Sequence, residues 1–186
     1  MRQDSKAKLW VGAHLSKGKD LVDTINEIIE MGGNSLQLFL SPPINSGKGI
    51  SLKESEIKTA QKLQGQIFIV IHGKYILNFC RPRSNTTEWQ FDCLKHDLRQ
   101  ANLIGADVII HQGKNLADLG QSDAEACRTF VNNLMTILEE TSELNNRIIL
   151  ENSCQQGNEL GYTIEQLGYI FGLIDAIILS LQSKKV

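Results

Sequence analysis

The run IFIVIH at residues 67–72 decides the fold, because it is the clearest strand in the sequence and ends in a histidine. Four of its five apolar residues are β-branched, which favours a strand. The run is apolar throughout rather than alternating, as is typical of a parallel sheet covered on both faces. The runs DVIIH at 107–111 and RIILE at 147–151 repeat the pattern. We therefore expect these segments to be neighbouring parallel strands.

Along the rest of the sequence, predicted strands alternate with segments of helical periodicity. The predicted strands cover residues 9–15, 35–40, 67–72, 107–111 and 147–151, and the predicted helices cover 19–31, 52–64, 88–104, a segment after 122 and one after 163. Ser122 with Glu125, and Thr163 with Gln166, have the spacing of capping boxes. Five strand–helix units form either an open doubly wound sheet or a (β/α) barrel.

The composition is that of an ordinary globular chain. The 186 residues are 41% hydrophobic and 22% charged, with a formal net charge of −2. This excludes a disordered or low-complexity chain, and no linker divides residues 1–186, so we expect one domain. The net charge shows no basic nucleic-acid surface, although a local basic patch remains open.

The cysteines and the N-terminal residues predict the compartment. The four cysteines, at positions 80, 93, 127 and 154, form no CxxC pair, and residues 1–6 precede no apolar signal segment. We expect buried free thiols, with Cys154 packed near the sheet rim, in a reducing intracellular compartment: the cytoplasm, or the nucleus of a eukaryote. The apolar run at 167–181 contains Asp175 and has 15 residues, fewer than a spanning helix needs. We predict a buried helix or strand there, and no membrane association.

Four of the five predicted strands end in a residue that can bind a metal ion: His14, His72, His111 and Glu151. The carboxyl ends of parallel strands meet at one rim, where α/β folds carry their active sites. Two histidines and a carboxylate with an open position are the ligands of a catalytic zinc ion. We predict that His72, His111 and Glu151 bind zinc and that His14 lies beside them. The alternative for any single histidine is a structural role.

The remaining histidine and the loop after residue 72 give weaker evidence about the function. His96 is predicted to lie on the solvated face of its helix. The loop carries Lys74, Tyr75, Arg81 and Arg83, which suit contacts with phosphates and stacked bases. The same residues are equally typical of an exposed loop. No GxSxG, Walker or GxGxxG motif follows a strand.

Several motifs in order resemble endonuclease IV, the zinc-dependent apurinic/apyrimidinic endonuclease family of base-excision repair. They are GAHLS at 12–16, HGKYILN at 72–78, HQG at 111–113, LENSCQQG at 150–157 and GNELGYTIEQL at 157–167. The resemblance implies a (β/α)₈ barrel with up to three zinc ions. It also implies that a metal-bound hydroxide cleaves the phosphodiester 5′ to an abasic site in DNA.

The resemblance also assigns individual residues. It implies that His72 and His111 bind the first zinc, that Glu151 bridges two zinc ions across the nucleophile, and that His14 is a catalytic residue near the site. It implies that Tyr75 and Ile76 enter the DNA at the abasic position, and we add Lys74 and Arg81 as DNA-binding residues.

The sequence departs from the family in several ways, one of which is Ser153-Cys154-Gln155 in place of the family's Thr-Ala-Gly. Gln112 stands where the family usually has proline, and the family's arginine-bearing loop after the second strand is replaced by SPPINSGKG at 41–49. A complete barrel takes about 250 residues, whereas this chain has five units of the eight. Residues 172–186 diverge from the family, and its later ligands have no counterpart after Glu151.

We therefore expect a truncated barrel with one zinc or a partial site. Activity of the chain alone would be impaired, and stability would depend on self-association or on a complementing chain. Two other functions stay open: a metal-dependent sugar isomerase or epimerase on the same barrel, and a non-catalytic fragment.

Overall fold

Five parallel strands form one sheet in the computed structural model, which describes residues 8–47 and 49–183. The strands are β1 (Gly12–His14), β2 (Ser35–Leu38), β3 (Phe68–His72), β4 (Asp107–Ile110) and β5 (Ile148–Leu150). They lie side by side in chain order. The prediction of five parallel strands is confirmed, with β1 and β5 shorter than expected. The N-terminal residues 1–6, Lys48 in the loop after β2, and the last residues 184–186 lie outside the described residues.

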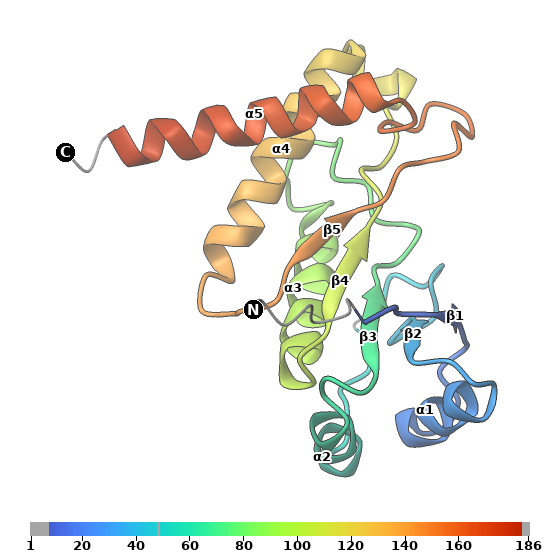
Figure 1. The fold of residues 1–186 in the computed structure, drawn as a ribbon. Helices are drawn as coiled ribbons and strands as arrows, with labels where there is room; N and C mark the ends of the chain where they lie inside the picture. Colours follow the sequence, from blue (N-terminus) through green and yellow to red (C-terminus); the bar gives the residue numbers. More distant parts are fainter. Residues whose placement is uncertain (1–7, 48, 184–186) are drawn as a thin grey trace.

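A helix follows every strand, as predicted (Figure 1). The helices are α1 (Leu21–Glu30), α2 (Glu54–Lys62), α3 (Glu88–Leu103), α4 (Asp123–Glu140) and α5 (Ile164–Ser183), with a short 3₁₀ helix η1 (Ala117–Leu119) before α4. Neighbouring parallel strands joined by helical crossovers are the repeating unit of a (β/α) barrel. The sheet in the described residues is an open part of such a barrel, with β1 and β5 at its edges.

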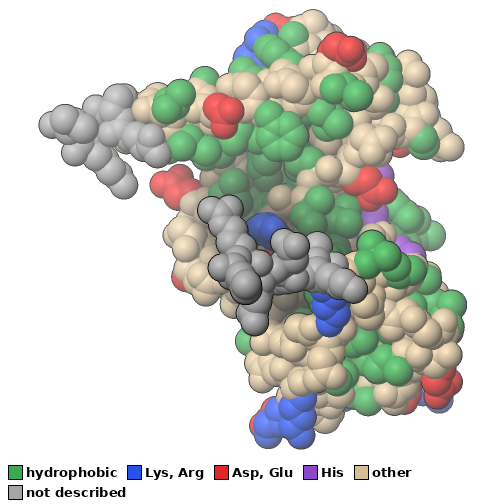
Figure 2. All heavy atoms as spheres, in the orientation of Figure 1, with side chains coloured by type: hydrophobic (Ala, Val, Ile, Leu, Met, Phe, Trp, Pro, Cys, Tyr) green, Lys and Arg blue, Asp and Glu red, His purple; other side chains and the backbone are tan. Residues whose placement is uncertain are grey.

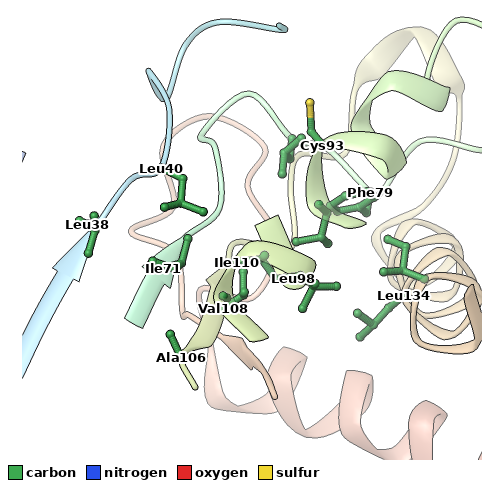
Figure 3. Packing of buried hydrophobic residues seen from close by; sticks show 14 of the residues in the cluster. Leu38, Leu40, Ile71, Phe79, Cys93, Leu98, Ala106, Val108, Ile110 and Leu134 are labelled. Carbon is green, nitrogen blue, oxygen red and sulfur yellow. The ribbon is translucent and has the colours of Figure 1, made fainter. Parts of the chain in front are cut away.

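The hydrophobic core lies between the sheet and the helices. Leu38, Ile71 and Val108 point from the strands toward the helices and are fully buried (Figure 3). Leu98 of α3 and Leu134 of α4 pack against them in the same cluster. Burial of such side chains stabilises the sheet by roughly 1.5–3 kcal/mol each, and it holds the strand ends at fixed positions.

The two predicted capping boxes differ in the structure. At α4 the box is complete: the Glu125 backbone N–H donates to Ser122 Oγ, and the Ser122 N–H donates to the Glu125 carboxylate at 2.8 Å. Near α5 only half of it forms. The Gln166 N–H donates to Thr163 Oγ1, but the Gln166 side chain accepts from the Gly161 N–H instead.

Helix α5 corrects one expectation about burial. It contains the apolar run predicted to be buried, yet only 6% of residues 164–181 are buried. Figure 1 shows its C-terminal part projecting beyond α4, and Figure 2 shows hydrophobic side chains along it. By length and composition alone this helix could cross a membrane, which for a single helix is weak evidence. Residues 172–183 of the divergent segment belong to this helix.

Candidate metal centre

Three metal-binding side chains meet where β3, β4 and β5 end. His72 is the last residue of β3, and His111 and Glu151 directly follow β4 and β5. One ligand atom of each lies within 4.8 Å of the other two, the one such group among the described residues. His72 Nε2 is 3.1 Å and His111 Nε2 is 3.9 Å from Oε2 of Glu151. The structure therefore brings the three predicted ligands together.

The separations between these atoms fit a zinc ion. Zinc binds histidine nitrogen and carboxylate oxygen at about 2 Å, so tetrahedral donors stand roughly 3.3 Å apart. The distances from Glu151 Oε2 to His72 Nε2 and to His111 Nε2 lie on either side of that value. Only small movements of the side chains would be needed to hold the ion.

The His72 ring is oriented as a metal ligand. Its Nδ1 atom lies 2.6 Å from the Gly73 carbonyl oxygen. A carbonyl accepts only, so Nδ1 carries a proton and, in the neutral ring, Nε2 presents a lone pair. That lone pair faces the Glu151 carboxylate oxygen. Two acceptors this close are stable only with a cation or a proton between them.

The surroundings of His111 favour the neutral ring that a metal ligand requires. Burial lowers the pKa of His111, an effect that the nearby Glu151 carboxylate opposes. The neutral ring is the form that binds a metal ion. His111 is thus prepared to be a ligand at neutral pH.

His14 lies beside the centre but is not among the three clustered donors. Its ring centroid is 6.0 Å from that of His72. The Gln37 side-chain amide is 2.9 Å from His14 Nδ1 and donates to it, which leaves the ring proton on Nε2. Burial and the nearby His72 lower the pKa of His14.

Phe39 is a site residue that the sequence analysis missed. Its ring centroid lies 4.8 Å from His14, 4.8 Å from His72 and 5.0 Å from Tyr75. The sequence could have indicated this position, because side chains alternate between the two faces of a strand. Residue 39 therefore faces the same side as Ser35 and Gln37 of β2. Tyr75 extends the group, with centroids 5.2 Å from His72 and 6.0 Å from His111.

A cavity of about 1010 Å³ opens next to His111. Tyr75, Ile76, Arg81 and Trp89 are among the residues that line it. Tyr75 is 56% exposed, so its ring is free to meet a ligand. The Arg81 guanidinium is paired with Asp118 at 3.3 Å on the surface.

Lys74 corrects the predicted set of DNA-binding residues. Its side chain is buried, at 4% exposure, and its ammonium group donates to the carbonyls of Asn45 and Gly47. A group held in this way is not available to a phosphate. Arg83, a third cation of this loop, is bound to Glu88 and Glu140.

The remaining histidine and the cysteines also differ in part from expectation. His96 lies away from the cluster as predicted, but its Nε2 atom is buried rather than solvated. Cys80, Cys93 and Cys127 are buried, as predicted, and not disulfide-bonded. Cys154 is exposed and lines the cavity instead of packing in the core.

A comparison with known sequences identifies the fold family. The sequence model of the xylose isomerase-like TIM barrel family matches residues 25–178. The chain belongs to this family.

Curated relatives of this TIM-barrel chain carry endonuclease names. A "Probable endonuclease 4" of Thermotoga sp. (strain RQ2) is 31% identical over 89% of this chain and 58% of its own length. An "Endonuclease 4 homolog" of Dictyostelium discoideum is 26% identical over 93% of this chain and 32% of its own. A third endonuclease 4 relative, from Acanthamoeba polyphaga mimivirus, is 30% identical over 87% of this chain and 53% of its own. The chain thus spans about half the length of the curated relatives it matches, and less of the Dictyostelium protein.

Solved structures similar to this TIM-barrel chain include sugar epimerases. A D-tagatose 3-epimerase-like protein superimposes with a TM-score of 0.65 at 19% identity, over 86% of this chain and 60% of that one. A 3-keto-D-glucoside 4-epimerase from E. coli gives 0.64 at 10% identity, over 89% of this chain and 65% of that one. At these identities the likeness shows the fold alone.

Proposed function

We propose that this protein is a zinc-dependent endonuclease of base-excision repair that cleaves DNA on the 5′ side of an abasic site. The observation that carries the proposal is the group of His72, His111 and Glu151, whose ligand atoms all lie within 4.8 Å of one another. The endonuclease names of the aligned relatives support it.

The three clustered residues would hold the metal. His72 and His111 would be neutral nitrogen ligands, and Glu151 would be the carboxylate ligand. Zinc held there would lower the pKa of a coordinated water and polarise a phosphoryl oxygen, which is the chemistry that phosphodiester hydrolysis requires. His14, with its proton on Nε2, would donate a hydrogen bond to the substrate beside the centre.

The exposed side of the loop after β3 would meet the DNA. Tyr75 and Ile76 would enter the base stack at the abasic position, as aromatic and apolar wedges do in other DNA complexes. Arg81 would exchange Asp118 for a phosphate at little cost, because an exposed ion pair contributes only about 0–1 kcal/mol. Lys74 takes no part in this contact.

The extent of the chain bears on the activity of the whole protein. Since it covers about half of its relatives, we propose that the described residues supply part of a larger centre and hold about one zinc ion. Further ligands would come from a complementing polypeptide, a second copy or a longer form of this protein. The buried thiols of Cys80 and Cys127 suit an intracellular, reducing location.

The test combines zinc content with incision of a duplex that contains one abasic site. We expect about one zinc per chain, with incision in the chain or in its complemented form. Both are lost in His111→Ala and both are kept in His96→Ala, the control histidine outside the cluster. Less than about 0.2 zinc per chain without incision, or equal losses in the two variants, would contradict the proposal.

The epimerase alternative is tested on the same preparation. It requires a group that moves a proton at a sugar carbon, and it predicts exchange of a ketohexose carbon-bound proton with solvent. Proton exchange without DNA incision would favour that alternative.

A further inference from the structure

The loop between β2 and α2, residues 39–53, is fastened to the rest of the molecule by Lys74. The Lys74 ammonium donates to the Asn45 carbonyl at 2.7 Å and to the Gly47 carbonyl at 2.5 Å. Lysine is seldom buried, because removing its charge from water is costly unless the charge is compensated. A lysine 4% exposed whose donors end on loop carbonyls therefore has a specific structural task.

Helix α3 supports the same loop from the other side. The Leu52 N–H donates to the Gln100 side chain at 2.7 Å, and Cys93 Sγ lies 3.6 Å from the Gly47 carbonyl oxygen. At Gly49 the loop lies directly against the helix. A Cβ atom there would stand 2.9 Å from Asp97 Oδ1 and 2.6 Å from the His96 ring, so a larger residue would push the loop away.

Asp97 provides the buried negative charge near Lys74. Its side chain is 2% exposed, and Oδ1 has no hydrogen-bond partner in the described part of the chain. Burial raises the pKa of Asp97 to about 7, while the Lys74 charge acts in the opposite direction. The Lys74 charge therefore acts on Asp97, whereas the partners of the Lys74 ammonium itself are the carbonyls of Asn45 and Gly47.

We propose that Lys74, through its hydrogen bonds to the Asn45 and Gly47 carbonyls, is a positioning residue that locks the β2–α2 loop to the β3–α3 loop and so fixes Phe39 and Tyr75 at the mouth of the candidate metal centre. Phe39 begins the first loop, and Tyr75 follows Lys74 directly. Their ring centroids are 5.0 Å apart, and Phe39 also touches His72. The consequence for substrate binding rests on the proposed function, whereas the fastening of the loops does not.

The first experiment replaces Lys74 with methionine, which keeps an unbranched apolar side chain one atom shorter and removes the charge. Hydrogen exchange of the amides at 44–47 and 49–52 should become at least about tenfold faster, because local opening then costs less free energy. Zinc content should stay unchanged. Lys95→Met is the control, since Lys95 pairs with Glu140 at 2.7 Å on the other side of α3. It should change neither quantity.

Kinetics distinguish positioning from a phosphate contact. If Lys74 positions Tyr75, Lys74→Met raises the KM for the abasic duplex several-fold while the dependence of binding on salt stays the same. If Lys74 binds a phosphate, the slope of log K against log salt falls by about 1, and the proposal is wrong. Unchanged amide exchange would overturn it equally.

Gly49→Ala tests the lock while leaving the Lys74 side chain unchanged. The added methyl group should lift the loop from α3 and reproduce the faster exchange with normal zinc content, even where Lys74→Met fails to fold. Protection equal to that of the unmodified chain would contradict the proposal. Exchange and zinc content do not depend on activity, so absence of incision in the unmodified chain would count against the proposed function alone.

Discussion

The side-chain amide of Gln112 is buried without hydrogen-bond partners in the described part of the chain. Its side chain is fully buried, and neither Oε1 nor Nε2 has a hydrogen-bond partner among the described residues. Gly161 packs on it so closely that a Cβ there would lie 2.4 Å from Oε1. A buried amide without partners costs roughly 1–3 kcal/mol. The departure noted at this position in the sequence therefore lowers stability.

We predict that Gln112→Met stabilises the chain by about 1–2 kcal/mol, because the flexible thioether fills the same space without polar atoms. Urea unfolding measures the change. Gln100→Met is the matched control: it removes the acceptor of the Leu52 N–H and should destabilise by about 1 kcal/mol. If both variants destabilise equally, the two Gln112 atoms have partners in solution.

Asp97 predicts a pH dependence of stability. Its pKa is raised to about 7 by burial, from an ordinary 3.8. The folded chain therefore holds this proton where the unfolded chain releases it. The contribution to stability is full below pH 4 and is lost as pH rises through 7, by roughly 4 kcal/mol at most.

Asp97→Asn should remove that dependence. We expect the variant to be more stable than the unmodified chain at pH 8, with the advantage disappearing toward pH 4. Denaturant unfolding at four pH values measures it, with Asp92→Asn on the exposed side of α3 as control. An identical pH profile in the unmodified chain and Asp97→Asn would show that Asp97 ionises normally.

At the scale of elements, α5 carries large apolar side chains that are exposed. Leu179 is 64% exposed and Phe171 is 52% exposed, whereas Ile170 is fully buried. Exposed apolar area of this kind promotes association. We predict that the 186-residue chain self-associates through α5 and that Leu179→Glu shifts it toward the monomer without lowering its melting temperature.

Sedimentation velocity measures this change in mass. Ile170→Glu is the contrasting variant, since a charge in the core should unfold the helix and its neighbours. An unchanged sedimentation profile for Leu179→Glu would place the association elsewhere.

The elements themselves were predictable, and so was the convergence of His72, His111 and Glu151 at one rim of the sheet. Strands such as 67–72 and 107–111 are recognisable from their short apolar runs. Parallel pairing brings their carboxyl ends together regardless of how the helices pack. The role of Lys74 was not predictable, because it depends on where the loop at 45–47 returns. The exposure of α5 was missed for a related reason: an apolar sequence indicates that a helix could be covered, but tertiary packing decides whether it is.

At the scale of the whole molecule, the metal centre joins three strands. His72, His111 and Glu151 lie at the ends of β3, β4 and β5, so a bound ion would link segments that are far apart in the chain. Ligands that bind only the folded state stabilise it by about 2.7 kcal/mol at one hundred times Kd. We predict that zinc at this excess raises the melting temperature by roughly 5–10 °C.

Calorimetry with and without zinc measures this shift. In His111→Ala the zinc-dependent increase should vanish, while the melting temperature without zinc changes little. An equal increase in both proteins would mean that zinc binds elsewhere on the chain.

The order of the strands also has a consequence for synthesis. Each strand pairs with the one made immediately before it, so the sheet can grow by one strand at a time as the chain leaves the ribosome. His72 emerges 79 residues before Glu151. The nascent chain therefore has to complete its fifth strand before all three metal ligands are present, and the earlier strands have to assemble without help from the ion.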